Sequence, residues 1–488
     1  MSITGMSNIP DWNDVELSMY LLDELGGNSS STNRDYLANL TSWLTITPKY
    51  TVYRVNTLAH RGEEVQDIIY KELSKQAVSR GLDAPSVFIH EEMPEVVLMD
   101  SWDVASLNLS FQDKEVIVDI ACGVAVLRGA HVFAPGIKGM SRDTASGDYV
   151  SVFADVKNKC TRGLICSFTE EKFFVGNGIV RIGRNDLFGK AALVKGIAIE
   201  MIDIRSAIPS LPLNCIPDSY AMLQNLPSVL SCRALAPSAG EIVLDMCAAP
   251  GNKTTHLAML MNNKGTVIAI DKTSTKVDAI KDRCQQFGIS CVKSFVFDST
   301  KAVLEVKKPE DGTVKIQNFH QKKVTEEKCE DLSKCPENIE MKPPFPPETF
   351  DKILLDAPCS AMGQRPQIIS SVSLKQLKSY PPLQRKLFQA AVTLLKRGGH
   401  LVYSTCTITV AENEHLIKWA LNKFPYLELA QVESNLGGPG LENMGLTEEQ
   451  RQYVKRFGPP MNSLELYYDN YDYNQDTVGF FIAHFVKK

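Results

Sequence analysis

Two cysteines in short motifs are the side chains best suited to covalent chemistry. Cys359 follows Asp356-Ala357-Pro358, and Cys406 stands in Ser404-Thr405-Cys406-Thr407. A thiolate is a strong soft nucleophile that can add to an electron-poor ring carbon when its surroundings lower its pKa. Asp356 beside it could hold or protonate a ring nitrogen, and Lys253 could supply a positive charge. The alternative is that both cysteines are buried, inert thiols.

A second group of residues suits ligand binding. The run from Asp245 to Thr254 is rich in small residues and precedes a predicted helix, whose first N–H groups are free to bind a ligand. Asp271 ends a predicted strand, where a carboxylate can accept hydrogen bonds from a ribose diol, and Asp298 is placed for an adenine amino group. Either Asp could instead cap the next helix. Together they favour an adenosine-containing ligand.

Strands and helices that alternate along the chain would position these residues. The pattern predicts strands at 241–246, 266–271, 292–298, 350–356 and 400–404, and helices at 254–261, 273–287 and 382–396. The last helix is predicted to begin at Pro382 and to end before Gly398-Gly399. Such alternation predicts a doubly wound parallel sheet, in which ligands bind beyond the carboxyl ends of the strands.

The chain divides into three predicted domains. Residues 1–113 show no single helical or strand pattern, but helices are expected at 15–25 and 64–79. We expect these residues to form an α+β lobe that is completed by 207–235. Residues 114–206 show short apolar runs separated by glycines, at 116–127, 149–153 and 196–204, which predict a small β-rich domain. Residues 236–488 hold the parallel sheet. Within them, the Lys/Glu/Pro-rich stretch 305–347 is predicted to be a mobile surface insertion.

Length and composition are those of a globular protein of about three domains. The 488 residues are 44% hydrophobic and 22% charged, with a mean hydropathy of −0.11. We expect an intracellular, cytoplasmic protein, because no stretch resembles a membrane span or a signal peptide. The twelve cysteines are scattered, which favours reduced thiols, and their spacing does not suit zinc.

The net charge hides a difference between regions. The whole chain carries a formal charge of −5, but residues 114–206 contain thirteen basic and ten acidic side chains. A mildly basic module within an acidic chain is compatible with a local nucleic-acid contact, although an ordinary solvated face would look much the same.

The motifs resemble those of the Sun-type RNA cytosine-5 methyltransferases, which use S-adenosylmethionine and two cysteines. The resemblance rests first on Asp245 to Lys253, Asp356 to Gly363 and Ser404 to Thr407, in that order. It extends to Arg54-Val55-Asn56-Thr57, to Gln224 to Ser228 and to Gly479 to Ala483, and so covers most of the chain. It implies a Rossmann-like class I methyltransferase domain.

The middle segment narrows the resemblance to one branch of the family. Val126 to Ile137, followed by Gly147-Asp148-Tyr149-Val150, looks like a PUA domain, an RNA-binding module. The sixth, PUA-containing branch methylates C72 at the acceptor end of transfer RNAs, with the PUA domain reading the CCA terminus. Messenger RNA sites are also attributed to it. The resemblance therefore implies an RNA partner. We expect a monomer, with no metal ion and no membrane association, because nothing in the pattern requires an oligomer, a metal or a membrane.

Roles carry over to matching positions. Cys406 would attack C6 of cytosine, Cys359 would help to release the product, and Asp356 would bond the N3/N4 edge with help from Lys253. The implied cofactor-binding residues are Cys247, Ala248, Ala249, Pro250, Gly251, Asn252, Lys253, Asp271, Asp298 and Asp356. The expected RNA-binding residues of the PUA-like segment are Arg128, Lys157 and Lys159.

Three residues depart from the family pattern. Asn252 and Ala361 each stand where the family usually has Gly, and Val372 stands where close relatives have Trp. If position 252 required positive φ, the cofactor loop would be shifted. Two other functions are therefore weighed. The first is a non-catalytic RNA-binding protein with a methyltransferase fold. The second is a small-molecule or protein methyltransferase, which would need neither cysteine.

Overall fold

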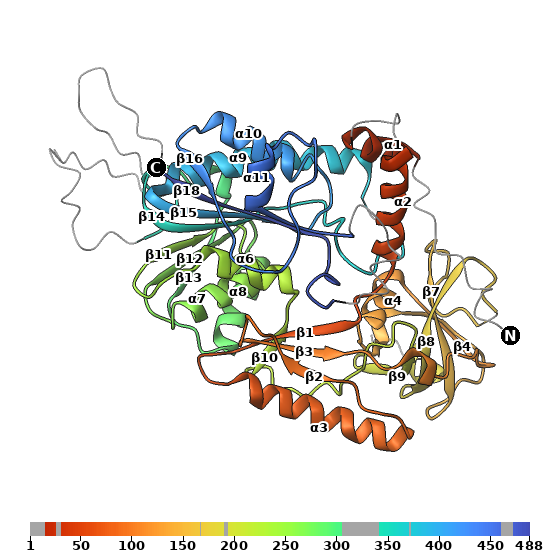
Figure 1. Ribbon diagram of the computed structural model, residues 1–488. Helices are drawn as coiled ribbons and strands as arrows, with labels where there is room; N and C mark the ends of the chain where they lie inside the picture. The colour runs from red at the N-terminus through yellow and green to blue at the C-terminus, as the bar shows by residue number, and fades with distance from the viewer. Residues whose placement is uncertain are drawn as a thin grey trace, which may run out of the picture.

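The computed structural model describes residues 15–25, 31–165, 167–189, 194–304, 341–369, 372–459 and 472–488. Three β-sheets organise these residues (Figure 1). Residues 305–340 of the predicted insertion lie outside the described residues. The remaining part, 341–347, includes Phe345, which is buried in the core of the largest sheet.

The largest sheet has eight strands. They are β11 (Ile242–Asp245), β12 (Thr266–Asp271), β13 (Val292–Val296), β14 (Phe350–Asp356), β15 (Leu395–Thr405), β16 (Leu427–Ala430), β17 (Val454–Phe457) and β18 (Phe480–Lys487). The order is β13-β12-β11-β14-β15-β18-β16, and β17 also pairs with β18. The first five are mutually parallel, whereas β16, β17 and β15 pair antiparallel with β18. The order reverses between β11 and β14, so a ligand crevice is expected beyond their carboxyl ends.

Helices cover both faces of this sheet. They are α6 (Leu226–Leu235), α7 (Asn252–Leu260), α8 (Ser274–Gln286), α9 (Leu374–Leu394), α10 (Glu414–Lys423) and α11 (Glu448–Tyr453). Figure 1 shows α6, α7 and α8 on one side and α9 and α10 on the other. Successive strand residues serve opposite faces, since Val243 belongs to the apolar cluster around α7 and Leu244 to the cluster around α9. The predicted Rossmann-like fold is confirmed.

Helix α9 corrects the predicted helix 382–396. It begins eight residues earlier, at Leu374, and Pro381 and Pro382 lie inside it. Ser373 starts the helix with a capping box, because its hydroxyl accepts from Gln376 N and the Gln376 side chain accepts from the Ser373 N–H. Pro382 is therefore not a helix start. Lys396 and Arg397 belong to β15 and not to the last turn of the helix.

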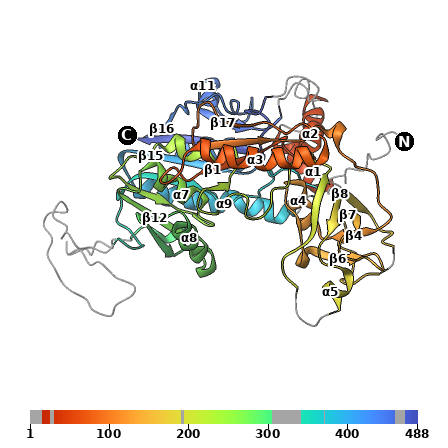
Figure 2. The same ribbon diagram turned by 90° about the horizontal axis from the view of Figure 1, so that it is seen from below.

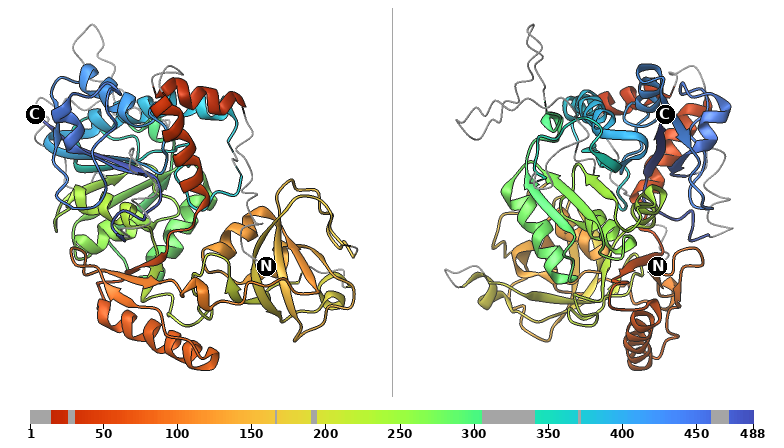
Figure 3. Two further views of the ribbon diagram at one scale, coloured as in Figure 1. Left: turned by 45° about the vertical axis from the view of Figure 1, so that its right-hand side comes forward. Right: turned by 90° about the vertical axis from the view of Figure 1, so that its left-hand side faces the viewer.

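The N-terminal residues supply three helices, of which the first two pack against Leu377 and Ile408 of the large-sheet region, and most of a small sheet. Its strands are β1 (Tyr50–Val55), β2 (Val87–Ile89), β3 (Val96–Asp100) and β10 (Ala221–Leu223), in the order β10-β1-β3-β2. Helices α1 (Val15–Glu24) and α3 (Gly62–Arg80) match the predicted ones, whereas α2 (Ser31–Thr45) was not predicted. Figure 3 shows α2 running from the large-sheet region down to β1.

A six-stranded sheet holds the middle segment. Its strands are β4 (Glu115–Val118), β5 (Val132–Phe133), β6 (Ile137–Met140), β7 (Tyr149–Asp155), β8 (Lys172–Val180) and β9 (Ile197–Ile204), in the order β5-β9-β8-β7-β4-β6. Helices α4 (Ile120–Leu127) and α5 (Arg184–Phe188) accompany it. The apolar run 116–127 is thus a strand and a helix, divided by Asp119, which caps α4 through Cys122 N at 2.8 Å. Figure 2 shows this sheet to one side of the large sheet.

Among the described residues, no helix is both long and apolar enough to cross a membrane. In the same part of the chain, no group of three or more His, Cys, Asp or Glu side chains is arranged to hold a metal ion.

Candidate active site

The two predicted catalytic cysteines face each other beyond the ends of neighbouring strands. Asp356 pairs in register with Ser404 where β14 and β15 run parallel, so the loops that follow both strands leave the sheet together. Cys359 Sγ lies 3.4 Å from Cys406 Sγ, and both are free thiols. The Gly363 N–H also donates to the Cys406 carbonyl at 2.9 Å. The topology of the parallel sheet therefore brings the two motifs together.

Lys253 and Asp356 form an ion pair beside these thiols. Lys253 lies in the first turn of α7, and its Nζ is 2.7 Å from Asp356 Oδ2. The other carboxylate oxygen accepts from Ser404 Oγ at 2.7 Å. Lys253 Nζ also lies 5.4 Å from the centre of the Phe480 ring. All four predicted catalytic residues thus gather at the edge where β11, β14 and β15 end.

The paired thiols have opposite acidities. The pKa of Cys406 is lowered, first because Cys359 donates a hydrogen bond to its sulfur, and further by Lys253 and Gln364, against the effects of burial and Asp356. The pKa of Cys359 is raised well above its usual value by the same hydrogen bond, by burial and by the charge of Cys406. Cys406 is therefore the more acidic thiol of the pair, and the one better suited to act as a nucleophile.

A buried carboxylate, Glu412, fixes the loops that carry both cysteines. Its Oε1 accepts from Ser360 Oγ at 2.6 Å and from Thr409 Oγ1 at 2.9 Å. Its Oε2 accepts from Ser360 N at 3.0 Å and from Gln384 Nε2 at 2.8 Å. Ser360 follows Cys359, and Thr409 lies three residues beyond Cys406. The sequence analysis missed Glu412, and its one signal was the polar run Glu412-Asn413-Glu414 after an apolar strand.

The predicted cofactor loop joins β11 to α7. Ala248 N donates to Ile270 O at 3.0 Å and Ala249 N to Asp271 Oδ2 at 3.1 Å, so the loop is held against β12. Gly251 has φ of +101° and is the N-cap of α7. A Cβ there would lie 3.2 Å from the Ile280 Cα. Burial raises the pKa of the Cys247 thiol well above its usual value, so this third cysteine of the region is a poor nucleophile.

The structure decides between the binding and the structural interpretations of Asp298, Asp271 and Asn252 in different ways. Asp298 follows β13 and caps the short 3₁₀ helix Ser299–Lys301 through Thr300 N, as the alternative prediction held. Asp271 is the last residue of β12 and does not cap α8, whose N-cap is Thr273. Asn252 is the first residue of α7 and is not among the residues with positive φ. The glycine that stands there in relatives is therefore not needed for this loop.

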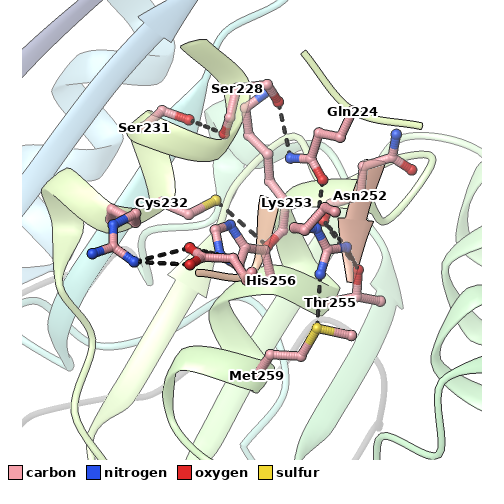
Figure 4. Close-up of polar contacts among 12 residues, drawn as sticks. Gln224, Ser228, Ser231, Cys232, Asn252, Lys253, Thr255, His256 and Met259 are labelled. Carbon is pink, nitrogen blue, oxygen red and sulfur yellow. Dashed lines mark hydrogen bonds and ion pairs between the residues drawn. The ribbon is translucent and has the colours of Figure 1, made fainter. Parts of the chain in front are cut away.

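Arg54 ties the N-terminal lobe to the start of α7, where Figure 4 labels its partners Gln224, Asn252 and Thr255. Its guanidinium is fully buried and donates to Gln224 Oε1 at 2.7 Å, to Thr255 Oγ1 at 2.8 Å and to the Asn252 carbonyl at 3.2 Å. The Cys232 thiol donates to the Lys253 carbonyl at 3.7 Å. Strand β1 therefore supports the turn that presents Lys253 to Asp356.

The predicted RNA-binding residues lie in two places. Arg128 ends α4 and donates from Nε to the Arg365 carbonyl at 2.9 Å, at the boundary with the large-sheet region. Lys157 and Lys159 are exposed in the turn after β7, and Lys157 pairs with Glu171 at 2.8 Å. The sequence analysis missed an open hollow lined by Arg142 and Arg162. No sequence motif marked these two arginines.

A cavity of about 340 Å³ lies where the three sheet regions meet. We call it the interlobe cavity; it is lined by residues of 47–52, Arg128, Ile208, residues 223–228, Asn252, Gln364-Arg365 and residues 476–478. Gln364 also helps to lower the pKa of Cys406, and its neighbour Gly363 donates to the Cys406 carbonyl at 2.9 Å. The cavity therefore adjoins the catalytic cluster, although Lys253, Asp356 and both cysteines are not part of its lining.

The fold and the site define a class of protein. A Rossmann-like sheet with carboxylates at its strand ends, and two cysteines of unequal acidity in contact beyond two of them, is the architecture of a cysteine-dependent methyltransferase. Residues 232–310 and 312–486 match the model of the family described as 16S rRNA methyltransferase RsmB/F.

The chain is also similar to individual proteins and to a solved structure. It is 42% identical over 455 residues to the tRNA (cytosine(72)-C(5))-methyltransferase NSUN6 of Mus musculus, covering 90% of this chain and 87% of the relative. It is 31% identical over 403 residues to the tRNA (cytosine(72)-C(5))-methyltransferase of Pyrococcus horikoshii, covering 82% and 84%. The crystal structure of NSun6 from Pyrococcus horikoshii with SFG matches with a TM-score of 0.68 at 26% identity, covering 97% and 98%.

The chain belongs to the RsmB/F family of S-adenosylmethionine-dependent RNA cytosine-C5 methyltransferases. The resemblance inferred from the sequence motifs is confirmed.

Proposed function

We propose that the protein methylates C5 of cytosine 72 in the acceptor end of CCA-ended transfer RNAs, through a covalent bond between Cys406 and C6 of the base. The observation that carries this proposal is the pair of thiols 3.4 Å apart, of which Cys406 has the lowered pKa and Cys359 the raised one. The relatives named for cytosine 72, at 42% and 31% identity, supply the choice of nucleotide.

The chemistry needs a nucleophile because C5 of cytosine is unreactive until C6 is attacked. Addition of Cys406 Sγ to C6 forms an S–C6 bond and moves the electron pair of the C5–C6 double bond to C5. Asp356, held by Lys253 and Ser404, would bond the N3/N4 edge of the base by accepting from its amino group, and the Lys253 ammonium would stabilise the negative charge that develops on the ring. After C5 has gained the methyl group, the C5–H bond breaks, its electron pair re-forms the C5–C6 double bond and the S–C6 bond breaks. Cys359 would assist this release by giving its thiol proton to the departing Cys406 sulfur, 3.4 Å away, and then accepting the C5 proton.

Carboxylates at the strand ends suit S-adenosylmethionine. Asp245, Asp271 and Asp356 are the last residues of β11, β12 and β14, and Asp298 follows β13. Carboxylates in this row match the amino, hydroxyl and adenine groups of such a ligand. The loop 247–253 and these aspartates would hold it, and when bound it supplies an electrophilic methyl group. Asp245 is a residue that the predicted set omitted, and burial raises its pKa to about 7.

The target base has to leave its stack to reach Cys406. Opening the acceptor end and flipping the cytosine costs a few kcal/mol, which contacts along the RNA must offset. We assign this role to residues 114–206 as a PUA module that reads the CCA terminus, with Arg128, Lys157, Lys159 and the newly found Arg142 and Arg162. We assign residues 1–113 together with 207–235 to the N-terminal lobe, and residues 236–488 to the methyltransferase domain.

The two alternative functions have less support. Asn252 was the main reason to consider a non-catalytic binding protein, but Gly251 supplies the positive φ of the loop and all four catalytic side chains are assembled. A small-molecule or protein methyltransferase leaves the paired cysteines without a role.

We further propose that messenger RNA sites with similar loops are secondary substrates, and that the protein acts as a cytoplasmic monomer.

Methyl transfer to defined RNAs tests the proposal. The protein and S-adenosylmethionine are incubated with a CCA-ended transfer RNA that carries C72, and with matched RNAs in which C72 is replaced by U or the CCA end is removed. We expect a methyl group to be transferred from S-adenosylmethionine only to the CCA-ended transfer RNA that carries C72. Equal labelling of the C72U transfer RNA would overturn the choice of nucleotide.

A further inference from the structure

Helices α1 and α2 pack against both loops that carry the catalytic cysteines. Met362 lies three residues after Cys359, and Ile408 lies two residues after Cys406. Both belong to one apolar cluster with the buried leucines of the two helices. Figure 1 shows α1 beside α9 at the edge of the large-sheet region. Because burial of apolar side chains is strongly stabilising, the helices and the two loops form one packed unit.

The end of α2 is bonded to the loop that follows Cys359. A helix leaves its last four carbonyls without partners inside the helix. Two of these, the carbonyls of Trp43 and Leu44, accept from Arg365 Nε at 3.0 Å and from Gln367 N at 2.7 Å. The last turn of α2 is thus fixed to this loop.

Glu24, in the last turn of α1, is bonded to the loop that follows Cys406. Its Oε2 accepts from Val410 N at 2.9 Å and from Ala411 N at 3.4 Å. In the described part of the chain no backbone carbonyl accepts from either N–H, so the carboxylate supplies their hydrogen bonds. Such bonds to an ionised acceptor are stronger than those between neutral groups. One side chain of α1 therefore holds the turn at Val410 and Ala411.

This turn is connected to both cysteines. Thr409 Oγ1 donates to Glu412 Oε1 at 2.9 Å, and the same oxygen accepts from Ser360 Oγ at 2.6 Å. Ser360 Oγ also lies 2.6 Å from Thr407 Oγ1. Ser360 follows Cys359, and Thr407 follows the second cysteine. A shift of the turn would therefore be passed to the residues next to both sulfurs.

The position of Glu24 has an energetic cost. Burial raises the pKa of its carboxyl group, and the charge of Glu412 adds to this effect, against the lowering by Tyr20 and by the two N–H groups. A neutral side chain at the end of α1 would avoid the cost. A carboxylate that is kept in such surroundings is commonly tied to function.

We propose that Glu24 is a positioning residue for methyl transfer, which acts from α1 through the Val410–Ala411 turn to hold the Cys406 sulfur against Cys359. The proposal rests on the proposed function, because it takes Cys406 to be the nucleophile. Without Glu24 the contact between the two sulfurs is no longer fixed, so the pKa of Cys406 rises. Helix α1 is thus part of the catalytic unit, although it is remote from the methyltransferase motifs in sequence.

The first readout needs no RNA. Iodoacetamide alkylates thiolates, so the pH at which Cys406 reacts at half its maximal rate reports the pKa of this thiol. Alkylation is followed on the Cys406 peptide by mass spectrometry. The proteins are the natural chain, Glu24→Ala, Glu24→Gln, which keeps an acceptor oxygen, and the control Glu16→Ala, at an exposed glutamate of α1. The second readout is single-turnover methyl transfer to the C72 transfer RNA at saturating RNA and S-adenosylmethionine.

We expect the half-maximal pH of Glu24→Ala to rise by about one unit and its methyl transfer at neutral pH to fall by about 10-fold, because both follow the thiolate fraction. Glu24→Gln should stay within about 3-fold of the natural chain, and Glu16→Ala should equal it. If Glu24→Ala does not fold, Glu24→Asp takes its place. Its carboxylate is one methylene shorter and should give the same shift to a smaller degree.

A half-maximal pH that is unchanged in folded Glu24→Ala, or in Glu24→Asp in its place, would overturn the positioning role. So would an equal shift in Glu24→Gln, because the acceptor oxygen would then not matter. If the pH shift occurs and the natural chain methylates no C72 RNA, the proposed function fails while Glu24 still positions the thiol.

Discussion

The thiol of Cys359 faces the sulfur of Cys406 across 3.4 Å, although 47 positions separate the two residues in the chain. Both follow neighbouring parallel strands, so the sheet and not the local sequence sets their separation. The hydrogen bond between them lowers the pKa of one thiol and raises that of the other. One contact therefore distinguishes the nucleophile from its partner.

The pH dependence of adduct formation should reveal this contact. Loss of the Cys359 donor should raise the pKa of Cys406 in Cys359→Ala, whereas Cys359→Ser keeps a hydroxyl donor. When the pH is lowered, the rate in Cys359→Ala should therefore begin to fall at a higher pH than the rate in Cys359→Ser. The measurement is the rate of covalent RNA adduct formation between about pH 5 and pH 9. Coincident acid limbs in the two variants would show that Cys359 does not set the acidity of Cys406.

Glu412 should matter for stability and for catalysis. Glu412→Ala leaves Ser360, Thr409 and Gln384 without their shared acceptor in a fully buried site. We expect the free energy of unfolding in urea to fall by about 3 kcal/mol or more. Below the unfolding transition, adduct formation should also slow, because the two thiols lose their fixed separation. Glu442→Ala, at an exposed carboxylate, is the control. An adduct rate equal to that of the natural chain would limit Glu412 to a role in stability.

Gly251 and Gly240 form a matched pair for the cofactor loop. Both have positive φ, at +101° and +91°, but an added Cβ meets the backbone of Ile280 at position 251 and nothing within 4 Å at position 240. Each Gly→Ala change should lower the free energy of unfolding by about 1–2 kcal/mol through backbone strain. Only Gly251→Ala should also weaken S-adenosylmethionine binding in calorimetry. Equal cofactor affinities in the two variants would place the ligand away from this loop.

Arg142 should contribute to RNA affinity through charge. It lines the open hollow of the six-stranded sheet region, where a phosphate can approach. Arg142→Ala should weaken RNA binding and reduce the slope of log affinity against log salt by about one unit. Lys281→Ala, at an exposed lysine of α8, is the control. A slope unchanged by Arg142→Ala would remove this hollow from the RNA path.

The sequence predicted that Lys253, Asp356, Cys359 and Cys406 lie together, because each is at or just beyond the end of a buried strand and parallel topology brings such ends to one edge. The strands at Asp271 and Asp356 end as predicted, those at Asp245 and Thr405 end one residue away, and β13 ends at Val296, two residues before the predicted Asp298. Cys406 and Cys359 could be paired on this ground alone, but the direction of their pKa shifts depends on side-chain contacts that no motif encodes.

Other features could not be predicted, or their signals were passed over. The apolar spacing of Tyr36, Leu40 and Trp43 marks α2, and the Ser373-to-Gln376 capping box marks the start of α9, whereas the preference of proline for first turns wrongly predicts a start at Pro382. Glu412 gave only the weak signal of a polar run, because two of the three residues that bond its carboxylate, Ser360 and Gln384, are distant in sequence. Ala361 adopts φ of +56°, which explains why a glycine is usual there.

A denaturing gel of the cysteine variants tests the central claim most directly. Cys359→Ala, Cys406→Ala and the double variant are each incubated with S-adenosylmethionine and a CCA-ended transfer RNA carrying C72, beside a C72U control RNA. We predict a slowly migrating protein–RNA band in Cys359→Ala alone, and only with the C72 RNA. A band that persists in the double variant, or methyl transfer by Cys406→Ala, would contradict the assignment of Cys406 as the nucleophile.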